Sequence, residues 1–402
     1  MKQLLARKDI RLLFAGQSVS MFGDWMMIIV LGIWAKTLTG SNSQAGLVFF
    51  VLALTGLVAP LGGLVVDRLP KRPLMIATNL ALAGVMCLLL LVHDRGDMWI
   101  LYGVTLLYGL GGDLFAASRG AMLKAMVPDE LLGEANGAYQ SIREGLRIVA
   151  PLAGAGIFAA WGGSVVAIVD AGTFLVSAAA LVALRFAEPP RAAKEHHFIK
   201  EISAGLTHIA RTRVLRELTF GLASALLVAG FSETLLFAIT SDSLHRSPSF
   251  VGVIGTAQGI GAIAGGVTSA WLMRRIGDVR LAGIGIVLFG IGDLFWMVPS
   301  IPVVLASTAI AGVGIVWAVV SLSTAYQRRS PNQVQGRVAA AANMLFAVPQ
   351  TIGIAAGAAL ITLVDFRVEI VTMTVVFLVA GAYLLTRRPE EATTEVEPAL
   401  AA

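Results

Sequence analysis

Apolar stretches of about 20 residues alternate with short polar or basic breaks along this chain of 402 residues. A stretch of that length can cross the hydrocarbon layer of a bilayer as a single helix. The pattern predicts twelve spans, at residues 12–36, 45–67, 73–92, 98–125, 136–160, 164–185, 216–240, 249–275, 279–297, 301–326, 334–364 and 368–387. We therefore expect an all-α membrane protein with twelve transmembrane helices.

One long polar connection divides these spans into two groups of six. The division predicts an N-terminal half at 1–185, a cytoplasmic linker at 186–215, a C-terminal half at 216–388 and a disordered acidic tail at 389–402. The segment that begins at Gly205 is amphipathic, which is typical of a helix on a membrane surface. A plain connecting segment explains it equally well.

The two halves repeat one another at an offset of 203 residues. A motif of two glycines followed by two basic residues occurs once in each half, and the two copies coincide at that offset. Its residues are Gly62, Gly63, Lys71 and Arg72 in the first half and Gly265, Gly266, Arg274 and Arg275 in the second. Pro128 and Gly133 likewise fall on Pro331 and Gly336, between the fourth and fifth spans of each half. Such a repeat indicates a duplicated membrane protein whose two halves have the same orientation.

Composition favours a membrane over a nucleic acid as the surrounding partner. The chain is 57% hydrophobic and only 14% charged, whereas soluble domains carry about 25% charged residues. Its basic residues lie in the short breaks, so we expect no nucleic-acid surface. Most of them lie on the side of the N-terminus, which predicts that both termini are cytoplasmic. No glycine loop for a nucleotide and no histidine cluster for a metal is evident, so we expect no cofactor.

The loop after the second span resembles the signature loop of the major facilitator superfamily. Gly63, Asp67, Arg68, Lys71 and Arg72 stand at the positions of that motif, with Pro70 in place of the usual glycine. The first span and its flanks are similar to the branch that contains macrolide-efflux-type exporters and the enterobactin exporter. Those residues are Arg7 to Gln17, Gly23-Asp24-Trp25 and Leu38 to Ser41. The resemblance covers almost the whole chain. It implies a transporter, not an enzyme, whose halves open alternately to either side.

The resemblance also implies a gate at the loop motif. Asp67 ends the second span, and in such a fold it would approach the N-terminus of span 11 near Gly336, where the positive helix end stabilises a carboxylate. Arg68, Lys71 and Arg72 would then pair with nearby acids or lipid headgroups. The alternative is that these basic residues only set the topology.

Two acids inside the N-terminal half are candidates for proton coupling. Asp24 falls near the middle of the first span, and Asp113 falls in the cytoplasmic half of the fourth. A carboxyl group that faces a cavity can bind and release a proton as access alternates. The other interpretation is a structural ion pair, and Gly23 indicates close helix packing at the same place.

The fifth span carries charges where apolar residues are expected. Arg143, Glu144 and Arg147 share one side of that helix and must face protein or water. We expect a charge network in which these arginines and Arg119 are neutralised by Asp24 or Asp113, and we assign Glu144 to the proton-coupling set. Direct contact of the arginines with an anionic substrate is the alternative.

Comparison of the halves predicts different roles for them. The offset places Leu227, Val316, Phe346, Ala347 and Gln350 opposite Asp24, Asp113, Arg143, Glu144 and Arg147. The first half is therefore expected to handle protons, and the second to offer an apolar wall. The expected substrate cavity contains Gln17, Phe231, Glu233, Trp317 and Phe346, with Glu233 facing a cationic group. Structural partners are expected for Asp170 and Asp293.

These observations predict proton-coupled export of an amphipathic small molecule by a monomer in the cell membrane, in contact with lipid. Within transport, a dedicated siderophore or natural-product exporter and an uptake carrier for a metabolite or lipid remain open. A non-transporting membrane sensor is the alternative from another class. A sensor needs neither midplane acids nor two symmetric halves.

Overall fold

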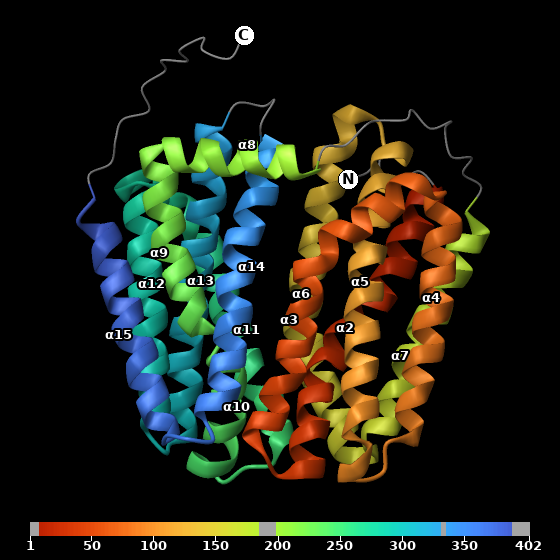
Figure 1. The fold of residues 1–402 in the computed structure, drawn as a ribbon, viewed down its shortest axis with the longest axis horizontal. Coiled ribbons are helices and arrows are strands. Elements are labelled where there is room, and N and C mark those ends of the chain that lie inside the picture. The colour runs from red at the N-terminus through yellow and green to blue at the C-terminus, as the bar shows by residue number, and fades with distance from the viewer. Residues whose placement is uncertain (1–7, 185–197, 331–334, 388–402) are drawn as a thin grey trace.

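The computed structural model describes residues 8–184, 198–330 and 335–387, and these ranges are helical almost throughout, without a strand (Figure 1). The N-terminal half contains six long helices: α2 Lys8–Thr39, α3 Asn42–Arg68, α4 Lys71–Leu88, α5 Met98–Met126, α6 Asp129–Trp161 and α7 Gly163–Ala183. Helix α8, Phe198–Arg211, follows. The C-terminal half contains α9 Arg213–Ala229, α10 Ser232–Ala238, α11 Val251–Ile276, α12 Asp278–Leu294, α13 Ile301–Arg329, α14 Gln335–Leu360 and α15 Phe366–Leu385.

The predicted all-α membrane fold is confirmed. Within the described ranges, eleven helical segments are long and apolar enough to cross a membrane. Helix α6 is of similar length but carries the charges of Arg143, Glu144 and Arg147. Each half forms its own bundle, and the two bundles stand side by side (Figure 1). Large apolar side chains such as Val267 and Val379 remain exposed, as expected where lipid covers the protein.

Local sequence explains where several helices begin and end. Gly40 and Gly162 adopt φ values of +70° and +81° in the α2–α3 and α6–α7 turns, a conformation that favours glycine. The Ser41 side chain accepts a hydrogen bond from the backbone N–H of Gln44 and so caps α3. Asp365 caps α15 in the same way, by accepting from the N–H of Arg367.

The predicted span 216–240 is broken in the structure. Helix α9 ends at Ala229, and α10 begins at Ser232. Gly230 lies directly against the backbone of Gly353 in α14. The absence of side chains on both glycines allows the two helices to touch at this break.

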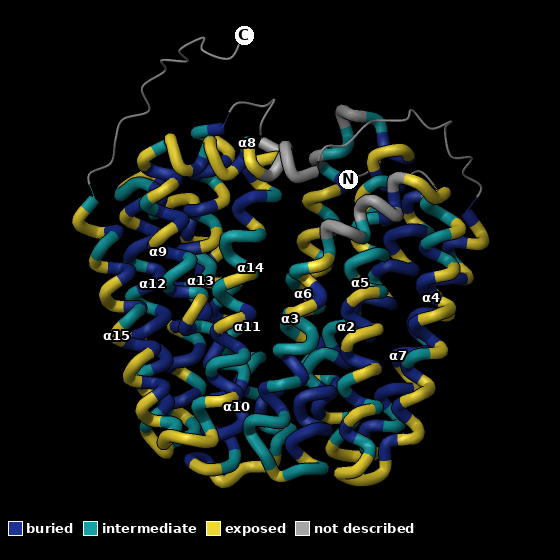
Figure 2. The backbone as a smooth tube through the Cα atoms, in the orientation of Figure 1, coloured by how far each residue is buried: buried dark blue, intermediate teal, exposed yellow. Residues whose placement is uncertain are grey.

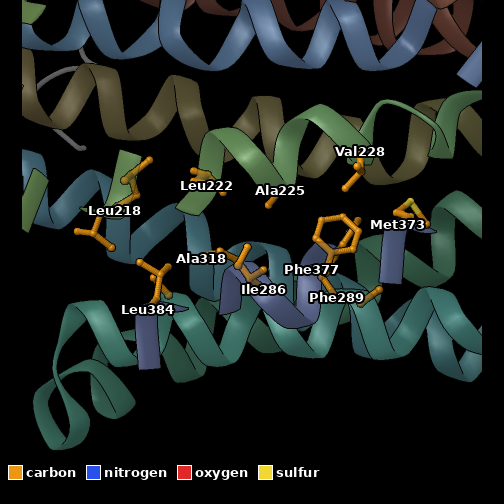
Figure 3. Close-up of a cluster of buried hydrophobic side chains, with 14 of the residues drawn as sticks. Leu218, Leu222, Ala225, Val228, Ile286, Phe289, Ala318, Met373, Phe377 and Leu384 are labelled. Atoms are coloured by element: carbon orange, nitrogen blue, oxygen red, sulfur yellow. The ribbon is translucent and has the colours of Figure 1, made fainter. Parts of the chain in front are cut away.

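Each bundle has a separate apolar core. In the C-terminal half, Leu218 and Leu222 of α9, Ile286 of α12 and Phe377 of α15 belong to one buried apolar cluster (Figure 3). The rings of Phe289 and Phe377 meet edge to face with centroids 5.0 Å apart. In the N-terminal half, separate clusters form around α2, α4, α5 and α7. Each half can therefore move as a unit without exposing its own core.

The halves meet at one end of the molecule. We call the face where α2 begins and α15 ends the terminal face, and the face that carries Gly40 and Asp365 the opposite face. The bundles diverge towards the terminal face and converge at the opposite face (Figure 1). Ile33 and Phe49 form a buried cluster with Phe237 and Ile354 from the other half. Where the two halves converge towards the opposite face, the backbone is mostly buried or intermediate (Figure 2).

Helix α8 lies across the end of the C-terminal half at the terminal face (Figure 1). Gly205 touches the backbone of Arg337 in α14, and His208 Nε2 lies 3.1 Å from the Arg329 carbonyl oxygen. Ile209 is buried while Leu206 is exposed, so α8 has one face on the protein and one face outward. The amphipathic pattern around Gly205 thus falls on a helix.

Candidate functional site

A cavity of about 430 Å³ lies within the N-terminal half. Helices α2, α3, α5 and α6 supply its polar groups, and Phe174 of α7 adds to its apolar wall. The polar lining residues that matter for chemistry are Gln17, Asp24, Thr55, Tyr108, Asp113, Arg119, Tyr139 and Arg143. Met21, Ile28, Leu52 and Phe115 complete a wall that is largely apolar. The cavity can therefore hold an amphipathic molecule against a small number of charged groups.

Asp24 is held at the cavity wall by a tyrosine. The hydroxyl of Tyr108 on α5 donates to Asp24 Oδ1 at 3.0 Å and lies 3.2 Å from the Asp24 carbonyl oxygen. The side chains of Asp170 and Thr173 of α7 lie against the neighbouring Gly23. The predicted packing role of Gly23 and the cavity-facing position of Asp24 thus occur together. Sequence reasoning missed Tyr108, because a tyrosine in an apolar span gives no distinct signal.

Asp113 also has a hydroxyl group beside it. The Thr55 hydroxyl of α3 lies next to the Asp113 carboxyl group and donates to the Leu52 carbonyl oxygen at 2.8 Å. Asp113 Oδ2 is buried without a hydrogen-bond partner among the described residues. Thr55 itself is buried and lies against Gly109, where α3 and α5 touch. Asp24 and Asp113 therefore line one cavity, and each lies beside a neutral hydroxyl.

The arginines are not neutralised by these acids in the described part of the chain. Arg119 places its guanidinium carbon 3.6 Å from the centroid of the Tyr139 ring, a cation–π contact. Arg143 Nε and Arg147 Nη1 lie 3.5 Å and 3.4 Å from the carboxylate of Glu144. The expected ion pairs with Asp24 and Asp113 are replaced by pairs along α6, because neighbours on one helix turn reach each other first. Glu144 itself is not among the residues that line the cavity.

The C-terminal candidates lie elsewhere. Phe231 is buried in the core of its own half, and the ring of Phe346 meets that of Tyr326 with centroids 6.5 Å apart. Trp317 donates its indole N–H to Thr268 Oγ1 at 2.9 Å. Glu233 is half-buried at the start of α10 and interacts electrostatically with Arg147 of the other half. Of the five expected cavity residues, Gln17 lines this cavity and the other four do not.

The basic residues of the loop motif bind helix ends. Lys71 Nζ donates to the carbonyl oxygen of Val66 at 2.5 Å, and Arg72 donates from Nε and Nη2 to the carbonyl oxygens of Leu181 and Val182 at 2.9 and 2.8 Å. Cations at these positions satisfy carbonyl groups that a helix leaves unpaired. Arg68 is exposed. The side chain of Asp67 and the surroundings of Gly63 and Gly336 lie outside what the structure describes.

Two buried acids outside the cavity have different surroundings. Asp170 is fully buried, and Thr173 Oγ1 lies 3.1 Å from its Oδ1, so the expected partner is present. Neither carboxylate oxygen of Asp293 has a hydrogen-bond partner among the described residues, which corrects the expectation of one. The nearby Trp296 indole donates instead to Thr308 at 2.8 Å, so these polar groups satisfy each other.

Polar contacts join the halves at the opposite face. Lys36 Nζ donates to Asn42 Oδ1 at 2.6 Å, and Asn42 Nδ2 donates to Asp242 Oδ2 of the C-terminal half at 3.1 Å. Ser43 Oγ donates to the carbonyl oxygen of Ala358 at 2.5 Å. We call the contacts of Asn42 and Ser43 with the C-terminal half the outer latch. They hold the opposite face closed while the bundles diverge at the terminal face.

Comparison with known proteins adds a family and several relatives. Residues 13–241 and 218–401 match the family model described as Major Facilitator Superfamily. An uncharacterised MFS-type transporter, YfiS of Bacillus subtilis, is 27% identical over 179 residues, which are 44% of this chain and 42% of the relative. Macrolide efflux protein A of Streptococcus pyogenes is 22% identical over 263 residues, 63% of this chain and 64% of the relative. The match thus spans less than two thirds of each relative.

Solved structures match over nearly the full length. The POT family transporter PepTSo superposes with a TM-score of 0.76 at 12% identity, covering 94% of this chain and 97% of the other. A bacterial homologue of the iron transporter ferroportin, in an inward-facing state, has a TM-score of 0.74 at 16% identity and covers 93% and 97% of the two chains. At these identities the likeness establishes the fold alone.

Proposed function

The chain belongs to the Major Facilitator Superfamily, and on this premise we propose that it exports an amphipathic small molecule in exchange for protons by alternating access. The site of exchange is the cavity of the N-terminal half, with Asp24 and Asp113 as the proton-binding groups. Export is supported by the relative named Macrolide efflux protein A. The protein would act in the cell membrane, as a monomer with both termini in the cytoplasm.

The observation that carries this proposal is the way in which the two acids are held. Each carboxyl group lines the same cavity beside a neutral hydroxyl. Tyr108 donates to Asp24, Thr55 lies next to Asp113, and no described cation is paired with either acid. A carboxylate locked in an ion pair gives up its proton-binding role, whereas a hydroxyl partner supports both protonation states. A proton and a cationic or polar group of the substrate can therefore occupy these acids in turn.

Alternating access follows from the two cores and the single closed end. Because each bundle packs around its own core, the halves can rock about their contact without unfolding. In the described conformation the bundles diverge towards the terminal face, and the outer latch joins them at the opposite face (Figure 1). Lys71 and Arg72, at the start of α4, join that helix to the ends of α3 and α7. The loop motif would therefore move with the N-terminal bundle and serve as the gate of the terminal face.

Gradient-driven efflux from reconstituted vesicles tests the proposal. Vesicles loaded with a lipophilic fluorescent dye would release it faster when the medium outside is made more acidic than the interior. Asp24→Asn should bring the gradient-dependent component down to the leak rate, because the amide keeps the Tyr108 contact but cannot take up a proton. Asp293→Asn is the control, since Asp293 is also an acid inside a predicted span but is fully buried and lies outside the cavity, whereas Asp24 is half-buried at its wall.

Each result assigns the mechanism differently. Loss in Asp24→Asn with retention in Asp293→Asn supports exchange at the cavity. Retention in Asp24→Asn and loss in Asp113→Asn would transfer coupling to the second acid. If the wild type releases every dye at a rate that does not depend on the pH gradient, proton exchange is contradicted.

A further inference from the structure

The cavity holds two acids and two arginines that do not neutralise each other. Within the described residues, Asp24 accepts from the Tyr108 hydroxyl, Asp113 lies beside the Thr55 hydroxyl, and Arg119 rests on the ring of Tyr139. The ion pair described for Arg143 is the 3.5 Å contact with Glu144, in which both side chains are more than two-fifths exposed. A solvent-exposed ion pair of that kind contributes little. The charged groups that line the cavity are thus available to bind protons or substrate.

The two kinds of charge differ in what can neutralise them. A carboxylate becomes neutral when it takes up a proton, whereas a guanidinium keeps its charge under all physiological conditions. Arg119 and Arg143 also interact electrostatically as like charges, so both lie near the same part of the cavity. When protons occupy Asp24 and Asp113, the cavity therefore carries net positive charge. Charge inside a membrane protein is costly unless a partner offsets it.

Arg119 is placed to receive an anion. The Tyr139 ring supports its guanidinium at 3.6 Å, a contact that uses the face of the group and not its N–H donors. Those donors lie in the guanidinium plane and suit the two oxygens of a carboxylate or a similar oxyanion. Tyr139 and Arg143 both come from α6, so one helix supplies the support and the second positive charge.

We propose that Arg119, supported by Tyr139 and with Arg143 beside it, binds an acidic group of the substrate. The transported class is then an amphipathic compound with a carboxylate or a comparable oxyanion, together with a basic group that replaces protons at Asp24 and Asp113. This inference rests on the proposed function for the role of the two acids. It narrows the substrate from any lipophilic cation to an acidic or zwitterionic amphiphile.

Matched dye pairs test the inference by binding alone. Tetramethylrhodamine free acid and its methyl ester share one cationic ring system and differ only in the carboxylate; rhodamine B and its ethyl ester form a second pair. Fluorescence anisotropy with the purified full-length protein in lipid nanodiscs gives the dissociation constant of each dye. We expect the acid to bind at least about tenfold more tightly than its ester, the usual effect of a charge-assisted hydrogen bond.

Variants then assign the preference to a residue. Arg119→Gln should reduce the ratio of ester to acid dissociation constants to about one, while Arg119→Lys, which keeps the charge, should retain part of the preference. Arg246→Gln removes an exposed arginine at the opposite face and should leave the wild-type ratio unchanged. The preference for the acid over the ester is measured first in the wild type. The inference can therefore still be tested if the Arg119→Gln protein fails to fold.

The outcomes separate this inference from the proposed function. Equal binding of acid and ester, tighter binding of the ester, or no binding of any of the four dyes to the wild type overturns it. A preference that survives in Arg119→Gln overturns the assignment to Arg119. Tighter binding of the acid without gradient-driven efflux would uphold this inference and contradict proton exchange. Gradient-driven efflux without tighter binding of the acid would uphold proton exchange and overturn this inference.

Discussion

Removal of the outer latch should shift the protein away from the described conformation. The latch joins the halves through Asn42 Nδ2 to Asp242 Oδ2 at 3.1 Å and through Ser43 Oγ to the carbonyl oxygen of Ala358 at 2.5 Å. Both bonds can form only while the opposite face is closed. The double variant Asn42→Ala/Ser43→Ala deletes them and leaves the apolar contacts of Phe49 and Phe237 in place.

The size of the shift follows from the two bonds. The Asn42 bond reaches a charged acceptor but is exposed, and the Ser43 bond is partly buried, so each contributes about 1 kcal/mol. Their loss changes the free-energy difference between the two conformations by about 2 kcal/mol, or roughly thirtyfold in the ratio of populations, because each 1.4 kcal/mol is tenfold. Ligand-free protein should then populate a state that is open at the opposite face.

Electron spin resonance distances between pairs of labels measure the populations. One pair, Thr37→Cys with Arg246→Cys, reports on the opposite face, and another, Lys124→Cys with Arg328→Cys, reports on the terminal face, all in a Cys87→Ser background. The first distance should lengthen and the second shorten in the double variant. Thr362→Ala is the control, because the exposed Thr362 hydroxyl near the opposite face bonds within its own half, to the Ala359 carbonyl oxygen at 2.7 Å. A change in the ratio of the two populations below about twofold, or an equal change in the control variant, would refute the reasoning.

Two further predictions concern stability. Gly154→Leu should lower the thermal unfolding temperature in detergent, because Gly154 lies directly against Met26 where α6 crosses α2, while Gly156→Leu should leave it almost unchanged because nothing lies within 4 Å of that position; similar effects of both substitutions would contradict the packing argument. Arg329→Gln should destabilise the protein by about 1–3 kcal/mol in chemical unfolding, because it leaves Asp278 without the guanidinium that binds it at 2.6 and 3.3 Å. Recovery in the Asp278→Asn/Arg329→Gln double variant is expected, and its absence would show that the loss comes from elsewhere.

The fold could be predicted closely from the sequence because the bilayer imposes a simple rule on it. Lengths of apolar segments locate the spans, and the predicted span 98–125 corresponds to α5 Met98–Met126. The break between α9 and α10 could not be predicted. It depends on the contact of Gly230 with Gly353, residues far apart in the chain, and a glycine inside a span gives no such information by itself.

The candidate site could be predicted only in part. Asp24, Asp113 and Arg143 were found because charges are rare in apolar spans, and all three line the cavity. The partners of these groups were not found, because Tyr108, Thr55 and Tyr139 are common in membrane helices and reveal their role only once the helices are assembled. Pairing of Arg143 was assigned to distant acids, although Glu144 on the same helix is nearer.

The C-terminal wall shows a second limit. Phe231 was placed in the cavity from its position along a span, but the rotation of a helix about its axis is set by packing, and in the structure Phe231 points into the core of its half. Hydrophobicity gives a span and not its orientation, because aromatic residues suit a core, a lipid surface and a binding wall equally well.

Substrate-induced proton release tests the central claim most directly. Purified protein in weakly buffered solution, near neutral pH and with a pH indicator, is mixed with a zwitterionic amphiphile that it binds. Exchange at the cavity predicts that binding acidifies the medium for the wild type and for Asp293→Asn, and that Asp24→Asn binds the compound with little or no acidification. Binding by the wild type with no proton release, or undiminished release from Asp24→Asn combined with Asp113→Asn, would contradict exchange at these two acids.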